Sequence, residues 1–359
     1  MKRAVFNILT IFLSVFVATS CCDNKAMTIE FLPEPQAEVR IDTVCLMFGG
    51  DLMQHIPQVR AAYKSGKYDY STSFQYVAPM FRNADIAVLN LETTLTTRGD
   101  YSGYPSFASP IEVADAMADM GIDVALLANN HCCDRAGRGI DTTVEQLAKH
   151  NIAHTGAFTG KEDYDANNVL HFKSKGIRFA LVNYTYGTNG YPVPKGKFVN
   201  IIDKERIKRD ISTINRDSVD CVIACMHWGI EYQRQPNAEQ KEMTQFLKSL
   251  GVDVIIGGHP HVVQTYEVSS DGVVFYSLGN LVSNQRKRYT NGGLIAEVNI
   301  VRCDTLPGLS YSANAHPVHV VLPGYRIVPR SVGDTLKMSA DSRQLYNIFM
   351  ADTDRLLKR

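Results

Sequence analysis

Five short apolar runs of the sequence each end in polar side chains that can bind a metal ion. The polar groups are Gly50-Asp51, Asn90 with Glu92, Asn129-Asn130-His131, His227-Trp228, and Gly258-His259-Pro260-His261. They offer carboxylate, amide and imidazole donors, and this mixture of oxygen and nitrogen ligands suits Mn, Fe or Zn. Glycines beside several donors allow tight turns and a close approach of the backbone to an ion. The sequence therefore predicts a divalent-metal centre assembled from five separate segments.

Each of these groups also has a simpler structural interpretation when it is taken alone. A Gly-Asp pair is commonly a turn, and an Asn-His pair commonly holds a loop by hydrogen bonds. His259-Pro260-His261 is as compatible with a structural loop as with a metal site. The metal interpretation depends on all five groups following apolar runs in one chain. In α/β proteins, ligands lie beyond the carboxyl ends of the strands, so these groups are expected to meet.

The apolar runs themselves have the length and composition of buried strands. They are rich in Val, Ile and Leu over about 5–8 residues. The runs expected as strands are Thr43–Phe48, Ile86–Leu91, Val124–Ala128, Phe179–Tyr184, Cys221–Met226, Val252–Ile256, Val273–Leu278 and Leu294–Val301. Connections in the second half are short and contain Gly or Pro. They favour antiparallel pairing there, and hence a mixed sheet or two sheets.

Segments between these runs carry the end signals of helices. One helix is expected to begin with Ser109 as N-cap and Pro110 at its first position, and to end at Gly121. Further helices are expected over Thr142–His150, Pro236–Leu250 and about Ser342–Leu357. Strands that alternate with helices predict an α/β fold.

The N-terminal segment has the features of an export signal. Two cationic residues precede an apolar run at 4–18, which is shorter than the roughly 20 residues that span a bilayer. Small residues then lead into Cys21, as in a bacterial lipoprotein signal whose new N-terminal cysteine carries a lipid. The sequence predicts a lipoprotein signal peptide over 1–21, a tether over 22–40 and lipidation at Cys21. Lipidation at Cys22 and an ordinary cleaved signal are the alternatives.

Export and charge together restrict the location and the partners of the protein. A lipid-anchored, extracytoplasmic position in the cell envelope is expected, with the membrane contacted through the N-terminal lipid. The 37 basic residues balance the 37 acidic ones. Charge therefore indicates no polyelectrolyte partner, and nucleic acid is not expected as a ligand. Residues 41–359 are numerous enough for one large core.

The order of the polar groups resembles that of the capsule-synthesis CapA family, a branch of the metallophosphoesterase superfamily. The matching strings are Gly50-Asp51-Leu52-Met53, Asn90-Leu91-Glu92, Ala128-Asn129-Asn130-His131, His227-Trp228-Gly229-Ile230-Glu231-Tyr232, Gly258-His259-Pro260-His261 and Ser277-Leu278-Gly279-Asn280. The resemblance implies a metallophosphatase-like sandwich of mixed β-sheets, flanked by helices, over residues 41–359.

The resemblance also implies roles for the matched residues. The expected ligands of two divalent ions are Asp51, Glu92, Asn130, His227, His259 and His261. His131 is expected to be catalytic without binding metal, by stabilising the transition state or protonating the leaving group. Residues expected to bind substrate or to support the ligands are Asn90, Trp228, Glu231, Tyr232 and Asn280. Of the ten histidines, the six outside these strings, His55 among them, are expected to be structural or surface residues.

Two positions depart from the wider superfamily in a way that the CapA branch shares. Met53 stands where an imidazole ligand is usual, and Glu92 stands where an aspartate bridges the two ions. The expected function is capsule or exopolymer (poly-γ-glutamate) synthesis through a two-metal hydrolase or phosphoesterase. Its substrate would be an acidic polymer or a phosphate compound, handled within a capsule synthesis complex. The alternative is a non-catalytic polymer-binding component of capsule assembly or export.

Overall fold

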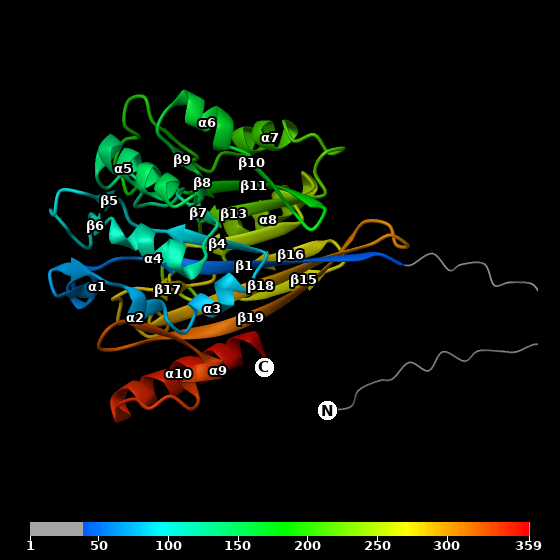
Figure 1. The fold of residues 1–359 in the computed structure, drawn as a ribbon. Helices are drawn as coiled ribbons and strands as arrows, with labels where there is room; N and C mark the ends of the chain where they lie inside the picture. Colours follow the sequence, from blue (N-terminus) through cyan, green and yellow to red (C-terminus); the bar gives the residue numbers. More distant parts are fainter. Residues whose placement is uncertain (1–38, 359) are drawn as a thin grey trace, which may run out of the picture. The chain divides into compact units, whose positions relative to one another are not determined.

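The computed structural model describes residues 39–358, which form two mixed β-sheets with helices beside them (Figure 1). The expected α/β sandwich of mixed sheets flanked by helices is confirmed. The predicted signal peptide, Cys21 and nearly all of the predicted tether lie outside the described residues. Nothing in the structure therefore bears on the lipid anchor.

The first sheet carries three of the five predicted groups, at the ends of β1, β4 and β7. Its eight strands are β1 (Ile41–Leu52), β4 (Ile86–Leu91), β7 (Val124–Leu126), β8 (Ala153–Thr155), β17 (Asn280–Val282), β18 (Gly292–Cys303), β19 (Leu309–Val321) and β20 (Arg326–Pro329). Their order is β20-β19-β18-β1-β4-β7-β8, with β17 paired to β1. The β1, β4, β7 and β8 strands are parallel, whereas β18 to β20 add antiparallel pairs. The parallel half brings several carboxyl ends to one edge.

The second sheet has the same mixed character. Its six strands are β10 (Leu170–Ser174), β11 (Ile177–Thr185), β13 (Cys221–His227), β14 (Val254–Gly258), β15 (Tyr266–Ser269) and β16 (Gly272–Phe275), in the order β10-β11-β13-β14-β16-β15. Its four central strands are parallel and its two edge strands are antiparallel. Three further pairs are β2 (Tyr63–Lys64) with β3 (Lys67–Tyr68), β5 (Leu95–Thr96) with β6 (Ser109–Pro110), and β9 (Ala157–Phe158) with β12 (Phe198–Val199).

Three apolar layers hold these sheets together. Side chains from both sheets, such as Phe48, Phe179 and Phe275, form the central layer. The other two layers lie between the outer faces of the sheets and the helices, and they include Met117 and Leu247. Helix bounds are α1 (Ile56–Ala62), α2 (Ser71–Phe74), α3 (Ala78–Arg82), α4 (Glu112–Met120), α5 (Ala136–Lys149), α6 (Lys161–Asn167), α7 (Lys204–Ser212), α8 (Ala238–Ser249), α9 (Arg330–Gly333) and α10 (Ala340–Leu357).

The predicted start of one helix is wrong. Ser109 and Pro110 form strand β6 instead of capping a helix, and α4 begins at Glu112. Strand pairing takes precedence because the Ser109 amide donates to the Thr94 carbonyl. The predicted end is confirmed, since Gly121 closes α4 with a φ of 81°.

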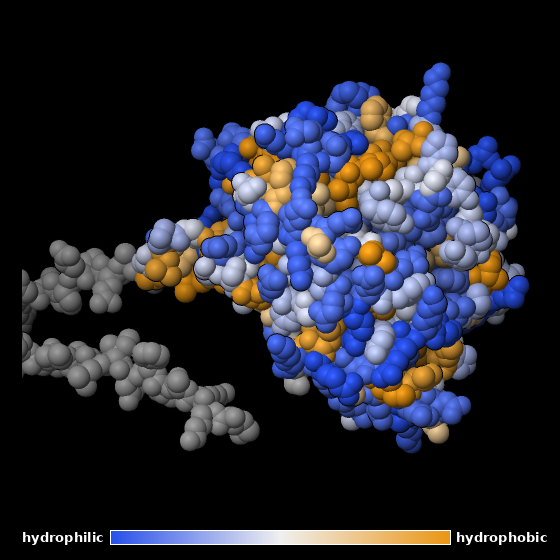
Figure 2. Space-filling model, turned by 180° about the vertical axis from the view of Figure 1, so that it is seen from behind, coloured by the Kyte–Doolittle hydropathy of each residue, from blue (hydrophilic) through white to orange (hydrophobic). Residues whose placement is uncertain are grey.

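Two surface properties bear on the sequence predictions. Among residues 39–358, no helix is long and apolar enough to cross a bilayer. On the face shown in Figure 2, hydrophobic side chains form separate patches between hydrophilic ones. The six cysteines of the described part are free thiols.

Candidate metal centre

The predicted donors meet where carboxyl ends of the two sheets come together. Asp51 is the penultimate residue of β1, Glu92 directly follows β4, and His227 ends β13. One ligand atom from each of these three buried residues lies within 4.8 Å of the other two. The centre therefore draws on both sheets, as the strand-end pattern predicts.

Close backbone packing brings β1 and β14 to this point. A Cβ atom at Gly50 would lie 2.1 Å from the Gly279 carbonyl oxygen, and one at Gly258 would lie 2.7 Å from Asp51 Oδ1. A side chain at Gly50 would disturb the pairing of β1 with the start of β17, and a side chain at Gly258 would push β14 of the second sheet away from Asp51. Beyond Gly258 the chain turns sharply, with φ values of 93° at His259 and 57° at His261. This turn brings both imidazoles to the centre, although an extended segment would point them apart.

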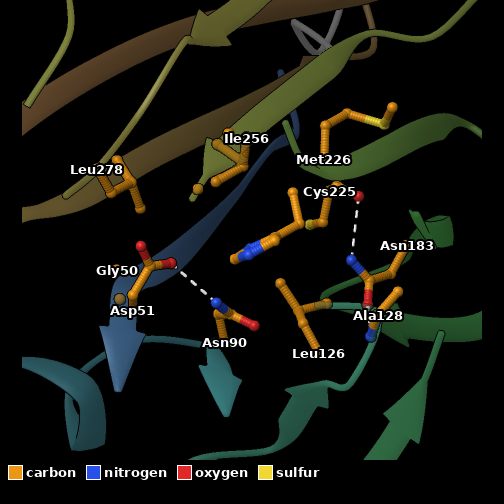
Figure 3. A pocket seen from close by; sticks show the side chains of 14 residues that line it. Gly50, Asp51, Asn90, Leu126, Ala128, Asn183, Cys225, Met226, Ile256 and Leu278 are labelled. Carbon is orange, nitrogen blue, oxygen red and sulfur yellow. Dashed lines mark hydrogen bonds between the residues drawn. The ribbon is translucent and has the colours of Figure 1, made fainter. Parts of the chain in front are cut away.

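The two carboxylates are held by amide donors. Asn90 Nδ2 donates to Asp51 Oδ1 at 2.8 Å (Figure 3) and to Glu92 Oε2 at 3.3 Å. The His259 amide donates to Asp51 Oδ2 at 3.2 Å. Burial would raise the pKa of Asp51, but its interactions with His261 and His227 outweigh burial and lower the pKa to about 2. Burial raises the pKa of Glu92 well above its usual range, and the charge of Asp51 adds to the effect.

The imidazoles of His261 and His227 each face a carboxylate or an amide. His261 Nδ1 lies 3.1 Å from Asn280 Oδ1 and 3.4 Å from Asp51 Oδ2. His227 Nε2 lies 3.0 Å from Asn130 Oδ1. Burial lowers the pKa of His227 well below its usual value, and repulsion from other histidines contributes to this decrease. Burial, with the charge of His261, lowers the pKa of His259 to about 3. The rings of His227 and His259 are therefore neutral, which is the form that binds metal.

The contacts of Glu92 test whether these residues fit a cation. Within the described chain, Glu92 Oε1 and His259 Nδ1 are buried and have no hydrogen-bond partner. Glu92 Oε1 lies 3.7 Å from His227 Nε2 and 3.8 Å from His261 Nε2. These distances are too long for hydrogen bonds, but they suit ligands that share an ion through bonds of about 2.0–2.2 Å. A cation would also favour the ionised form of Glu92. The donor set fits a divalent metal.

A small cavity of about 20 Å³ lies between the sheets beside Asp51. Figure 3 shows Asp51 and Asn90 on one side of it and the apolar side chains of Leu126, Ile256 and Leu278 around it. An apolar wall lowers the local dielectric constant, and charge interactions at the centre are correspondingly stronger.

His131 lies beside the ligands and is oriented by a carboxylate that the sequence analysis missed. Its Nδ1 is 2.8 Å from Asp134 Oδ2, and its Nε2 is 3.4 Å from Asn189 Nδ2. A proton on Nδ1 satisfies both contacts, with Asp134 accepting and Asn189 donating. A carboxylate three residues after a histidine was a usable signal for Asp134.

A loop after β11 adds residues that were also missed. The Tyr186 ring lies 4.4 Å from the His259 ring, between centroids, and Asn189 Oδ1 accepts from Asn130 Nδ2 at 3.2 Å. Tyr186 and Asn189 follow the run Phe179–Tyr184, which was expected as a strand. Their position beyond the carboxyl end of that strand was therefore a signal for a role at the centre. His55, expected to be structural, is also near the centre, because Phe107 packs against both its ring and that of His131.

The remaining predicted site residues fall into two groups. Asn90 and Asn280 contact ligands directly, and the Tyr232 ring lies 6.3 Å from the His261 ring. Trp228 is buried in the layer on the outer face of the second sheet, where its Nε1 donates to the Tyr276 carbonyl at 2.9 Å. Glu231 is exposed beside Tyr232 and raises the pKa of the Tyr232 hydroxyl, although burial contributes more to that shift.

The fold and the donor set together define an α/β sandwich with a candidate metal centre between its sheets. Residues 45–285 match the family described as "Bacterial capsule synthesis protein PGA_cap", and the chain belongs to this family. The predicted CapA resemblance is thereby confirmed.

Individual relatives agree with this family. The chain is 26% identical to the capsule biosynthesis protein CapA of Bacillus anthracis over an alignment of 308 residues. This alignment covers 80% of this chain and 72% of that protein. Over 270 residues the chain is 29% identical to the PGA biosynthesis protein CapA of Bacillus subtilis, with 74% and 70% covered. Among solved structures, the NAD nucleotidase of Haemophilus influenzae aligns with a TM-score of 0.49 and 11% identity, over 88% of this chain and 61% of that chain. At this TM-score the likeness assigns no activity to the chain.

Proposed function

We propose that the protein is a metal-dependent, phosphoesterase-like hydrolase that acts in capsule or poly-γ-glutamate synthesis at the cell envelope. The observation that carries the proposal is the convergence of Asp51, Glu92 and His227 within 4.8 Å, with Glu92 Oε1 lacking a hydrogen-bond partner among the described residues. Such a buried carboxylate is costly without a cation. Two divalent ions, of Mn, Fe or Zn, match the number and type of donors.

The ligands divide between two positions in this proposal. Asp51 and His261 would hold one ion, and Asn130, His227 and His259 would hold the other, with Glu92 shared. Bound divalent ions supply an acidic water and polarise the oxygens of the scissile group. Neutral imidazoles add no negative charge, so the centre attracts an anionic substrate.

His131 would serve as the general acid. Asp134 holds the proton on Nδ1 and directs Nε2 away from itself, toward Asn189. When Nε2 takes up a proton, the Asp134 carboxylate stabilises the imidazolium. That proton can then pass to the leaving oxygen of the substrate. Phe107 packs edge-on at 4.6 Å between ring centroids and restricts the orientation of the His131 ring.

Metal content and turnover of the same preparation test this function. The domain from residue 39 onward, loaded with Mn, Fe or Zn, is expected to hold close to two ions per chain by elemental analysis. It should hydrolyse a generic phosphodiester such as bis(p-nitrophenyl) phosphate, and chelation should abolish the reaction. A protein that retains metal but turns over neither this ester nor a glutamyl polymer would contradict the hydrolase function.

A non-catalytic, polymer-binding role is the second candidate, and Met53 favours it. This residue is 1% exposed and stands where the wider superfamily has an imidazole ligand. Met53→His should tighten the first ion and raise turnover if the centre is catalytic. If the protein only binds polymer, the substitution should change metal affinity without creating any turnover.

The membrane anchor is a separate part of the proposal. The apolar run and the small residues before Cys21 support a lipidated, extracytoplasmic protein that contacts a capsule synthesis complex at the membrane. Metabolic labelling with a lipid precursor should mark the full chain. Labelling that persists after both Cys21→Ser and Cys22→Ser would exclude lipidation at this position.

A further inference from the structure

A loop with consecutive cationic residues lies at the rim of the metal centre. Residues 284–290 follow β17 and read Asn-Gln-Arg-Lys-Arg-Tyr-Thr. Asn280 links this loop to the centre: its Oδ1 contacts His261 Nδ1 at 3.1 Å, and its Nδ2 donates to Gln285 Oε1 at 2.9 Å. The same Nδ2 donates to the Thr290 carbonyl at 2.8 Å, which ties down the other end of the loop. The cations are therefore held at a defined place relative to a metal ligand.

Two of the cations lack an acidic partner. Arg288 pairs with Asp352 at 3.0 Å. Within residues 39–358, no salt bridge is formed by Arg286 or Lys287, and both are exposed. Lys287 Nζ instead lies 3.8 Å from the centroid of the Tyr232 ring, which is itself beside His261. The Arg286 guanidinium lies 5.5 Å from the centroid of the Tyr325 ring and donates to Asn284 Oδ1. Two positive charges without an acidic partner in the described chain thus lie on a loop tied to a centre that attracts anions.

The loop also borders a groove. A groove of about 370 Å³ extends from these cations to α10, where Ile348 and Leu345 line it. A single phosphate would contact only part of this groove. A chain with repeated negative charges would bind both cations and continue along the groove toward α10. The extent of the groove therefore favours a polymer over a small anion.

We propose that Arg286 and Lys287 form a carboxylate-binding subsite that holds an acidic polymer beside the metal centre. The inference rests on the proposed function for the choice of polymer, but it does not require hydrolysis. Both cations lie on one loop, so neighbouring acidic groups of the polymer can bind them while another segment reaches the ions. These two residues would determine affinity for long polyanions, whereas the metal ligands would determine chemistry.

Binding of fluorescently labelled poly-γ-glutamate to the metal-loaded protein tests the subsite. Arg286→Gln with Lys287→Gln should weaken binding about 2–30-fold, as expected for two exposed ion pairs, with metal content unchanged. Lys208→Gln with Arg209→Gln is the matched control, because these adjacent cations are exposed on α7 and form no salt bridge in the described chain. The control should change binding less than twofold.

The outcomes separate this inference from the hydrolase proposal. Weakened binding in the rim variant alone supports the subsite, even if no turnover is ever seen. Equal affinities for wild type and rim variant would overturn it, even in an active enzyme. An equal loss in the control would also overturn it, since net charge alone would then explain binding. Binding of inorganic phosphate to the same proteins is the last measurement. If the variant with Arg286→Gln and Lys287→Gln loses phosphate binding but keeps polymer binding, the subsite is for phosphate and the polymer assignment is wrong.

Discussion

The two sheets contribute different chemistry to the same centre. The first sheet provides the carboxylates of Asp51 and Glu92, whereas the second provides the imidazoles of His227, His259 and His261. Neither sheet alone carries a complete donor set. Packing of the sheets through the central apolar layer is therefore what creates the centre, and bound metal should in turn hold the sheets together.

The two sheets also differ in how burial affects the ionisable groups that they contribute to the centre. Burial raises the pKa of Glu92 and lowers that of His259, so both groups are driven toward neutrality. Asp51 differs, because the histidines of the opposite sheet keep its pKa at about 2. The first sheet thus depends on the second for charge compensation. Variants in either sheet should reveal this dependence.

The largest expected effect is loss of metal from single ligand changes on either sheet. Asp51→Ala and His227→Ala should each lower affinity well beyond the roughly 10–100-fold typical of residues that only support a ligand. Elemental analysis after dialysis measures this loss. His316→Ala is the control, since that imidazole pairs with Glu297 on the first sheet. If only one of the two ligand variants loses metal, the two sheets do not share a centre.

The next largest effect is a loss of turnover in variants of residues that act in catalysis but do not bind metal. His131→Ala should lower turnover about 10²–10⁴-fold while metal content stays unchanged, because a positioned general acid contributes that much to rate. Asp134→Asn should shift the pH profile and reduce kcat more than it changes KM. Loss of metal in His131→Ala would show that this histidine is a ligand.

A smaller effect is expected where the two sheets are linked indirectly. Asn280 on β17 of the first sheet contacts His261 of the second at 3.1 Å. Asn280→Ala should lower metal affinity about 10–100-fold, because it leaves the His261 ring without its orienting acceptor. Titration with a metal-sensitive dye measures the change. A metal affinity equal to that of the wild type would show that Asn280 supports the fold and does not orient His261.

A buried histidine of the first sheet should have no effect on the metal centre and should change only the stability of the fold. Burial lowers the pKa of His319 to about 4, and its ring packs against Tyr346 and Phe349. Below an unfolded-state pKa near 6.5, the unfolded chain binds a proton that the folded chain excludes. The contribution of His319 to stability should therefore be complete above about pH 6.5 and fall by about 3 kcal/mol toward pH 4.

Denaturant unfolding across this pH range measures that slope. His319→Gln should flatten it, whereas His316→Gln should not, because His316 is partly exposed and paired with Glu297. Turnover should be unaffected in both variants at pH 7.5. A slope that is identical in all three proteins would assign it to other groups.

Much of the fold could be predicted because it is encoded locally. Buried parallel strands read as continuous apolar runs, and Ile86–Leu91 is a strand with the expected bounds. The end of α4 at Gly121 and the helix expected over Pro236–Leu250, which is α8 at Ala238–Ser249, likewise depend on neighbouring residues. The start of α4 could not be predicted, because a distant partner, Thr94, makes Ser109 part of a strand.

The sequence by itself determined which side chains could bind metal, because each donor follows an apolar run that must be buried as a strand. Only the tertiary structure decided which of them meet. Asn189 and Tyr186 join the centre through contacts with residues far away in the sequence, whereas Trp228, next to a ligand in sequence, points into the outer layer. The reason is that side chains alternate across a strand, so chain neighbours separate while the ends of distant strands converge.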